Sequence, residues 1–522
     1  MLTFQLTPYA DASWTLVGGG YTTADGASRV TPMDHSMVEH AAYTDGVRTL
    51  IVVREKVTGP PSLTPGVHRA DAAGLERIIS EAPEQPGDFV LVLTVPDLPV
   101  TVTASAARTT PLYLSTDNER LYGSWDMADL KPFGTRLHAV EVARLLAFRP
   151  RYSTQTVFEG VHRLTERATA YFGGSLHISY PVPALHHDAR ELAYSADVLG
   201  AFTELLHEAL DSRPWDPDTT VFHLSGGFDS GCIGATAAKR HPRQIRTAAL
   251  LIDGPGRTQQ ERRRAGMRTV LPFTEDDTTV DAAKRLPLDP ECLRVRGKLI
   301  SPYEEPLFYP FSQLTAKLAR AGASAVVTGL GGDELVALSQ TEVPHLDLNR
   351  MPVIPPWLGP TAATLLEYAD VGTAPPAPIN SMTLLALEST APPLRREGIW
   401  PVHPFAWTPL VEFGEQLPFD WREFKQLQHR LLESLGLGME VVRPVVRESF
   451  AEIVERALTG AGVELLDRML AEGSALFDDR LVDPDAVAAA AKRMRNGHYA
   501  EGEESKILEV IHLDLAARAF LS

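Results

Sequence analysis

The chain is short of cysteine and of positive charge. Only Cys232 and Cys292 occur among its 522 residues, which is too few for a disulfide framework or a cysteine-rich metal site. The formal net charge is −18, because 67 acidic residues outnumber 49 basic ones. This balance gives no electrostatic footprint for nucleic acid, and the basic run 262–264 in QQERRRAG favours a solvated helix face.

Long apolar runs are missing as well. No stretch has the roughly 18 consecutive apolar residues that a membrane-spanning helix needs. The start, MLTFQLTPYADASW, lacks the charged and apolar regions of a signal peptide. We therefore expect a protein without a membrane partner, located in the cytoplasm. His186 and His187 have no partner at zinc-like spacing, which favours a surface linker.

The pattern of apolar residues changes near residue 190. Up to about residue 180 it is β-rich, with strand-like segments at 47–54 and 88–94. Beyond it, a helical stretch at 193–210 precedes short apolar strands, which lie at 219–224, 245–253 and 323–330. This alternation predicts a parallel sheet with helices on both faces.

A stretch with prolines and histidines at 181–188 is the natural boundary, which gives domains at 1–185 and 186–522. The chain closes with a predicted amphipathic helix at 503–520, whose apolar positions are 507, 508, 511 and 515.

The stretch VFHLSGGFDSG (221–231) joins an apolar strand to a helix through two glycines. It is either an ordinary tight turn or a phosphate site, because glycine amides, first-turn N–H groups and the helix dipole all favour an anion there. No lysine follows the glycines as in a Walker A loop, and no G-x-S-x-G elbow is present. Asp229 would repel a bare phosphate, and a Mg²⁺ ion between the two resolves this conflict. The expected nucleotide-binding residues are Leu224, Ser225, Gly226, Gly227, Asp229 and Ser230.

A second stretch, ASAVVTGLGGDELVALS (323–339), repeats the order of strand, glycine turn and acidic residue. Alone it is equally a helix start with acidic residues in its first turn. Two such corners after two parallel strands can face one crevice. We therefore expect Asp229 and Asp333 to share the Mg²⁺ of one nucleotide. The glycines that would allow close backbone approach are Gly329, Gly331 and Gly332.

Here the sequence resembles the asparagine synthetase superfamily, whose synthetase domain carries an S-G-G-x-D-S pyrophosphate loop and a later G-x-G-x-D-E motif. SGGFDS and GLGGDE match both. The resemblance implies an α/β protein with an N-terminal Ntn-type αββα sandwich. It also implies a C-terminal doubly wound parallel-sheet domain of the adenine nucleotide α-hydrolase-like (ATP pyrophosphatase) type. The implied cofactors are ATP and Mg²⁺, and the implied reaction adenylates a carboxylate, releases pyrophosphate and forms an amide with an amine.

The front of the chain departs from the glutamine-dependent members, which cleave glutamine with an amino-terminal cysteine. This chain begins Met1-Leu2-Thr3, so we expect no ammonia from glutamine and a front domain that is structural or binds a partner. β-lactam synthetases and lasso peptide cyclases share this loss. Leu330, where β-lactam synthetases have tyrosine, and the segment YEEPLFYP are more similar to the lasso cyclases. The resemblance thus implies a specialised-metabolite ligase, such as one that closes a lasso peptide, with a precursor peptide and a partner protease as partners.

The catalytic residues match less well. Family members carry a lysine in an R-x-K-like segment near the end, whereas RPVVRESF has none. Arg447 or Arg443 would have to supply the charge, although arginine is not a neutral replacement for lysine. Lys425 matches a different, upstream family lysine, unless it is only a charge on a helix surface. Glu304 and Glu305 are candidates for orienting or deprotonating the amine, unless they lie in an exposed loop.

Two alternatives stay open. One is a β-lactam synthetase-like or intermolecular ligase that acts on a small molecule, and the other is a nucleotide-binding homologue without ligase activity that acts as a partner in a complex. The carboxylate and the amine, from a peptide or a small molecule, are not specified, because the least patterned region, 340–410, would form their pocket.

Overall fold

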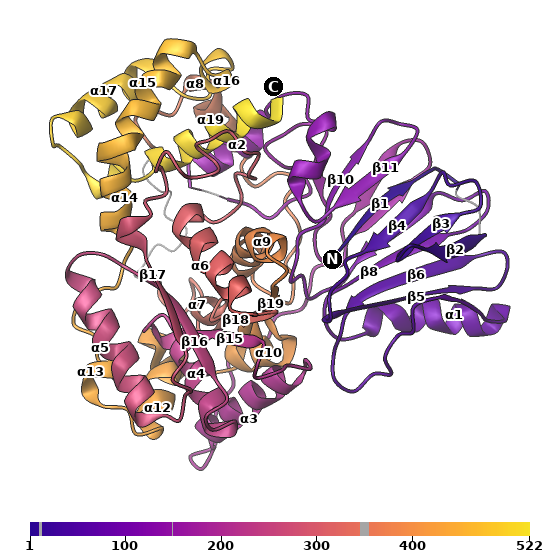
Figure 1. Cartoon of the computed structure of the whole chain (residues 1–522), viewed down its shortest axis with the longest axis horizontal. Helices are drawn as coiled ribbons and strands as arrows, with labels where there is room; N and C mark the ends of the chain where they lie inside the picture. The colour runs from indigo at the N-terminus through magenta and orange to yellow at the C-terminus, as the bar shows by residue number, and fades with distance from the viewer. Residues whose placement is uncertain (10–12, 149, 345–353, 522) are drawn as a thin grey trace.

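The fold is described from a computed structural model, in which residues 1–9, 13–148, 150–344 and 354–521 are placed. These residues form two seven-stranded sheets in the amino-terminal part and a five-stranded parallel sheet in the carboxyl-terminal part (Figure 1). The proposed boundary falls in a connection without helix or strand, between Ser179 and Val198.

The amino-terminal part is a sandwich of two sheets, with strand orders β12-β10-β11-β1-β4-β3-β2 and β14-β13-β9-β8-β6-β5-β7. Alternate residues of β1, Leu2, Phe4 and Leu6, are buried, as the period of a strand requires. The strands predicted at 47–54 and 88–94 are confirmed as β6 and β8. The bounds are β1 (Leu2–Leu6), β2 (Trp14–Val17), β3 (Gly20–Thr23), β4 (Arg29–Pro32), β5 (Val38–Thr44), β6 (Thr49–Glu55), β7 (Val67–Arg69), β8 (Phe89–Thr94), β9 (Val100–Ala104), β10 (Tyr113–Thr116), β11 (Leu121–Ser124), β12 (His162–Arg163), β13 (Thr169–Phe172) and β14 (Leu176–Ser179).

One outer face of the sandwich is covered by a helix. Helix α1 (Ala72–Glu81) lies on the second sheet, where Leu75 belongs to one apolar cluster with Leu50. The outer face of the first sheet carries the 3-10 segment η2 (Met127–Phe133) beside β10 and β11, while Thr3 of β1 stays partly exposed. Over much of its width, the described part of the sandwich therefore has three layers, where the resemblance implies four.

The five-stranded sheet has the order β17-β16-β15-β18-β19, and all neighbouring strands are parallel. Its first strand, β15, lies in the middle, so the sequence order reverses between β15 and β18. In open α/β sheets, ligands bind at the carboxyl ends of the strands at such a switch point. The three predicted strands are confirmed as β15, β16 and β18. The bounds are β15 (Thr220–His223), β16 (Arg246–Leu251), β17 (Asp277–Asp281), β18 (Ala325–Val327) and β19 (Trp400–Val402).

Helices cover both faces of this sheet, as the alternation predicts (Figure 1). In β15, Val221 packs in one cluster with Phe311 of α6, and Phe222 in another with Ile233 of α4. The bounds are α3 (Val198–Asp211), α4 (Phe228–Arg240), α5 (Pro255–Val270), α6 (Phe308–Arg320), α7 (Gly332–Leu335), α9 (Ser381–Arg396), α10 (Thr408–Glu415), α11 (Phe419–Arg422), α12 (Gln426–Ser434) and α13 (Met439–Val442).

The last helices form a cluster that also contacts the amino-terminal part. In α19 (Ile507–Leu521), Phe520 stacks on Phe158 with the ring centroids 4.1 Å apart. The expectation of an amphipathic final helix is wrong: His512 and Asp514 are buried as well, because neighbours surround the helix. None of the helices in the described ranges has the length and apolarity to cross a membrane. The other late helices are α14 (Ala451–Ala457), α15 (Val463–Glu472), α16 (Ala475–Asp478), α17 (Pro484–Arg495) and α18 (Glu501–Glu504). Residues of α2 (Ala139–Leu146), in the amino-terminal part, and of α8 (Pro360–Leu365) belong to the same apolar cluster.

A buried ion pair ties the sandwich to the parallel sheet. Glu55, at the end of β6, is fully buried and accepts hydrogen bonds from Arg213 Nε and Nη2 at 3.0 and 2.9 Å. The indole nitrogen of Trp400, the first residue of β19, donates to the same carboxylate at 2.9 Å. Removal of one partner from such a pair leaves a buried charge without compensation.

Arg213→Ala should therefore lower the free energy of unfolding by about 3–5 kcal/mol, because Glu55 would stay buried without its cation. The matched control is Arg136→Ala. The Arg136 side chain is 74% exposed in its pair with Glu159, and loss of an exposed pair costs about 1 kcal/mol or less. Urea denaturation of both variants measures the difference, and equal losses would contradict this account of the joint.

Candidate active site

The two glycine corners pack directly on each other at the carboxyl ends of β15 and β18. A Cβ at Gly329 would lie 2.5 Å from the backbone nitrogen of Ser230, and one at Gly332 would lie 2.5 Å from the carboxyl group of Asp229. Gly331 has a φ of +93°, which glycine adopts without strain. The second corner is glycine-rich because its backbone lies against the first.

The first corner leaves the amino-terminal end of α4 open. Its N-cap residue, Gly227, provides no side-chain hydrogen bond, and a Cβ there would meet only Ser225 Oγ, 3.3 Å away. Ser225 Oγ and Ser230 Oγ bond each other at 2.8 Å, and Gly226 makes the turn with a φ of +94°. The first-turn N–H groups and the dipole of this 13-residue helix suit a phosphate group.

Two cavities meet at these corners. The first cavity has a volume of about 600 Å³, and the second cavity has a volume of about 400 Å³. The residues that line both, here called the junction, are His223, Ser225, Gly227, Asp229, Phe311 and Asp333. A ligand in the first cavity can therefore contact a ligand in the second cavity at the junction.

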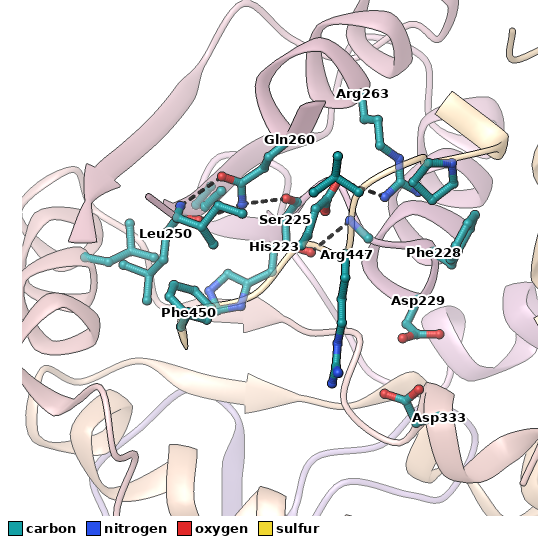
Figure 2. A pocket seen from close by; sticks show the side chains of 18 of the residues that line it. His223, Ser225, Phe228, Asp229, Leu250, Gln260, Arg263, Asp333, Arg447 and Phe450 are labelled. Carbon is teal, nitrogen blue, oxygen red and sulfur yellow. Dashed lines mark hydrogen bonds and ion pairs between the residues drawn. The ribbon is translucent and has the colours of Figure 1, made fainter. Parts of the chain in front are cut away.

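The first cavity has an apolar side and a cationic side. The apolar residues suit a flat aromatic ring such as a nucleotide base. They include Ala248, Leu250, Ile252, Leu314 and Phe450. Arg263, Lys425 and Arg447 supply positive charge, and Figure 2 shows the Arg447 side chain extending across the cavity on the side of Asp229 and Asp333.

Gln260 of α5 fixes the ends of β15 and β16 at the first cavity (Figure 2). Its Nε2 donates to the carbonyl oxygens of Ser225 and Leu250, at 2.9 and 3.1 Å. Its Oε1 accepts from the N–H of Ile252 at 3.0 Å. One buried amide thus holds two strand ends that carry cavity residues.

Lys425, immediately before α12, bridges the two aspartates. Its Nζ lies 2.7 Å from Asp229 Oδ2 and 2.6 Å from Asp333 Oδ1. Burial acts to lower the pKa of Lys425, but the charges and hydrogen bonds of the two aspartates outweigh burial and raise the pKa. Burial raises the pKa of Asp229, with Lys425 opposing the rise and Asp333 and Glu334 adding to it. The alternative interpretation of Lys425 as a helix-surface charge is wrong, because both ion pairs lie at the site.

The two aspartates fit a shared Mg²⁺ ion. Their oxygens converge on one point, as the contacts with Lys425 show, and Mg²⁺ prefers oxygen ligands. Within the described residues, no group of three or more metal-ligating side chains occurs. Mg²⁺ is commonly held by one or two carboxylates together with phosphate oxygens and water. The site therefore suits a metal ion that is also bound by a nucleotide.

The second cavity is acidic. Its carboxylates are Asp229, Glu305, Asp333 and Glu334, and no lysine or arginine is among the described residues that line it. Burial raises the pKa of Glu305, although the N–H of Leu307 donates to its carboxylate at 3.2 Å. Burial lowers the pKa of His223 to about 4, so its imidazole at the junction is neutral at physiological pH. This charge distribution favours a ligand with a positive or hydrogen-bond-donating group.

Most of the residues predicted for the site are brought together. Those that line at least one cavity are Ser225, Gly227, Asp229, Ser230, Glu305, Gly329, Gly331, Asp333 and Arg447. Gly226 and Gly332 line neither cavity: Gly226 forms the turn of the first corner, and Gly332 packs against Asp229. The roles of all these residues in binding or catalysis stay predictions.

Three predicted residues lie elsewhere. Leu224 is fully buried, and its carbonyl oxygen accepts from Arg264 Nε at 2.6 Å. Glu304 is buried in an ion pair with Arg396, at 2.7 Å. Arg443 lies on the surface, with 52% of its side chain exposed. None of the three lines either cavity, because each points into the core, into an ion pair or into solvent.

The basic run 262–264 is not a solvated helix face, so this expectation is wrong. Arg263 and Arg264 are buried, and the guanidinium of Arg263 lies 4.6 Å from the ring centroid of Phe228. The sequence alone does not identify Gln260 and Arg263 as cavity residues, because neither belongs to one of the two glycine motifs. A signal for His223 was present, since a histidine interrupts the apolar strand two residues before the first corner.

The carboxyl-terminal part is an open α/β domain with a parallel sheet. Such domains bind ligands in the crevice at the point where the strand order reverses. Residues 201–366, which include both glycine corners, match the model of the asparagine synthase family. The chain therefore carries an asparagine synthase domain, and the resemblance to the asparagine synthetase superfamily, a family of ATP-dependent amide ligases, is confirmed. No curated protein matches the chain significantly.

Gly332→Ala should displace the Asp229 carboxylate, because the new Cβ would lie 2.5 Å from it, and should lower the free energy of unfolding by about 1–3 kcal/mol. Gly502→Ala is the control, since a Cβ there meets nothing within 4 Å and alanine is the better helix former. Urea denaturation measures stability, and calorimetry with Mg-ATP measures nucleotide binding, which Gly332→Ala alone should weaken. Wild-type stability and binding in Gly332→Ala would show that the corners are not in close contact.

Proposed function

We propose that this protein is an ATP-dependent, AMP-forming amide ligase that joins a carboxylate to an amine through an acyl-adenylate. The observation that carries the proposal is the junction. There, a cavity with an apolar side and three cationic side chains meets a cavity whose own carboxylates are Glu305 and Glu334. Asp229 and Asp333 line both cavities, and Glu448 lines the first. A nucleotide suits the first cavity and an amine suits the second, so the acyl group would pass between them at the junction.

The first corner would hold the phosphates of ATP. The open space before α4 and the N–H groups of its first turn favour an anion. Mg²⁺ held by Asp229 and Asp333 would neutralise charge on the pyrophosphate leaving group. Arg447 has no hydrogen bond or ion pair of its guanidinium within the described residues and lines the same cavity, so it is available to stabilise charge that develops at the α-phosphate.

The proposed reaction has two steps. A carboxylate oxygen attacks the α-phosphorus, and the bond between the α-phosphorus and pyrophosphate breaks. The amine nitrogen then attacks the acyl carbon, the bond to AMP breaks, and the amine loses a proton. Glu305 in the second cavity would hold the N–H groups of the amine, and the neutral nitrogen of His223 at the junction offers a further acceptor.

Two features support a specialised ligase that does not use glutamine. Residues 1–185 contain no cysteine, so the front sandwich offers no thiol nucleophile, and we propose that it is a degenerate Ntn-type domain joined to an adenine nucleotide α-hydrolase-like domain at 186–522. Leu330 packs against the apolar cluster that contains Tyr152 and Leu384 and supplies no hydroxyl group. This favours a lasso cyclase-like ligase, with a precursor peptide and a partner protease, over a β-lactam synthetase-like one.

Release of pyrophosphate and AMP from Mg-ATP, measured over a panel of carboxylates and peptides, tests the proposal. We expect release that depends on the carboxylate, and Asp229→Asn and Asp333→Asn should each abolish it because the proposed metal ligands are lost. Arg443→Ala, on the surface outside both cavities, is the control and should keep the wild-type rate. Formation of ADP would contradict the proposal. Nucleotide binding without turnover across the panel would instead indicate the non-catalytic homologue.

Glu305→Gln should lower the rate of amide formation roughly a hundred-fold or more and leave carboxylate-dependent pyrophosphate exchange nearly unchanged, because Glu305 lies in the second cavity only. Its neighbour Glu304, paired with Arg396, provides the control: Glu304→Gln should lower the melting temperature and slow both steps alike. An equal loss of both steps in Glu305→Gln would refute the assignment of the amine to the second cavity.

A further inference from the structure

Lys425 occupies the point on which the two proposed metal ligands converge. Its Nζ lies 2.7 Å from Asp229 Oδ2 and 2.6 Å from Asp333 Oδ1. A Mg²⁺ ion bound to both oxygens at about 2.1 Å would overlap the ammonium group. Lysine and metal therefore exclude each other at this place.

The backbone is bent to bring Lys425 there. Phe424 and Lys425 are consecutive residues with φ of +49° and +56°, a region that residues with a side chain seldom adopt. Phe424 is 79% exposed, so packing of its own ring does not hold the turn. An ion pair with Asp333, whose side chain is 76% exposed, stabilises a fold little by itself. Strained backbone of this kind concentrates at functional sites.

Helix α12 anchors the turn on the second corner. Gln428 is buried, and its Nε2 donates to the carbonyl oxygen of Gly332 at 3.0 Å and lies 3.5 Å from Asp229 Oδ1. The start of α12 thus keeps a fixed position relative to the aspartates. Lys425 also lines the first cavity together with Ser225 and Gly227, so the flexible side chain can reach the place of the phosphates.

We propose that Lys425 is a positioning residue that holds Asp229 and Asp333 together in the free protein and keeps free divalent cations out. Its ammonium group leaves the two aspartates, and the metal binds there, only when nucleotide phosphates are present to bind the ammonium group. The two carboxylates and the ammonium group together carry a net charge of −1. A divalent cation without phosphates could bind both carboxylates only if it displaced the lysine side chain into water. The inference rests on the proposed metal–nucleotide site.

Lys425→Met keeps the length of the side chain without its charge and tests the proposal with Mn²⁺ as the probe. Electron paramagnetic resonance of free Mn²⁺ measures bound metal without turnover. The wild-type protein should bind Mn²⁺ here only together with α,β-methylene-ATP. Lys425→Met should bind Mn²⁺ without nucleotide, roughly ten-fold or more tightly than the wild-type protein, and Lys425→Gln is the second variant if the first does not fold.

Two controls define the site. Lys284→Met removes a lysine whose side chain is 80% exposed and should leave Mn²⁺ binding unchanged, and Asp333→Asn added to Lys425→Met should abolish the gained binding. Equal Mn²⁺ binding by the wild-type protein and the Lys425 variants without nucleotide would overturn the inference and leave the ligase proposal standing. Absence of Mn²⁺ binding in every protein, even with nucleotide, would overturn both the inference and the proposed metal site.

Discussion

The close approach of two backbone corners is the constraint on which the site depends. Gly329 lies against the backbone of Ser230, and Gly332 lies against the carboxyl group of Asp229, with no room for a Cβ at either glycine. This contact brings the ends of β15 and β18 together at the point where the strand order reverses. It sets the separation of Asp229 and Asp333, which both belong to the junction.

The rest of the chain supplies side chains to this junction from distant segments. Lys425 and Arg447 come from the last hundred residues, and Gln260 fixes the neighbouring strand end. Glu304 and Glu305 show how the two parts of the protein are coupled here. Glu305 faces the second cavity, while Glu304 bonds Arg396, which also pairs with Asp126 of the amino-terminal part. The front sandwich, whatever its ancestry, is thus fixed to the segment that carries a cavity residue.

The sequence predicted the parts of the fold that depend on local pattern. The apolar strand before the first corner and the strand before the second are β15 and β18, and the close backbone approach expected at the second corner is found at Gly329 and Gly332. The final helix is not amphipathic because its polar residues, such as Asp514, are buried by packing with helices far away in sequence. The position of Lys425 cannot be predicted for a related reason: its contact with Asp229 spans 196 residues, and no local pattern encodes it.

An adenylating ligase transfers AMP, and not phosphate, to a carboxylate. A carboxylate substrate labelled with oxygen-18, followed by mass spectrometry of the products, distinguishes the two reactions. If the acyl-adenylate forms, amide formation leaves one labelled oxygen in AMP and none in pyrophosphate. Label in inorganic phosphate, or AMP without label while amide is formed, would rule out an acyl-adenylate.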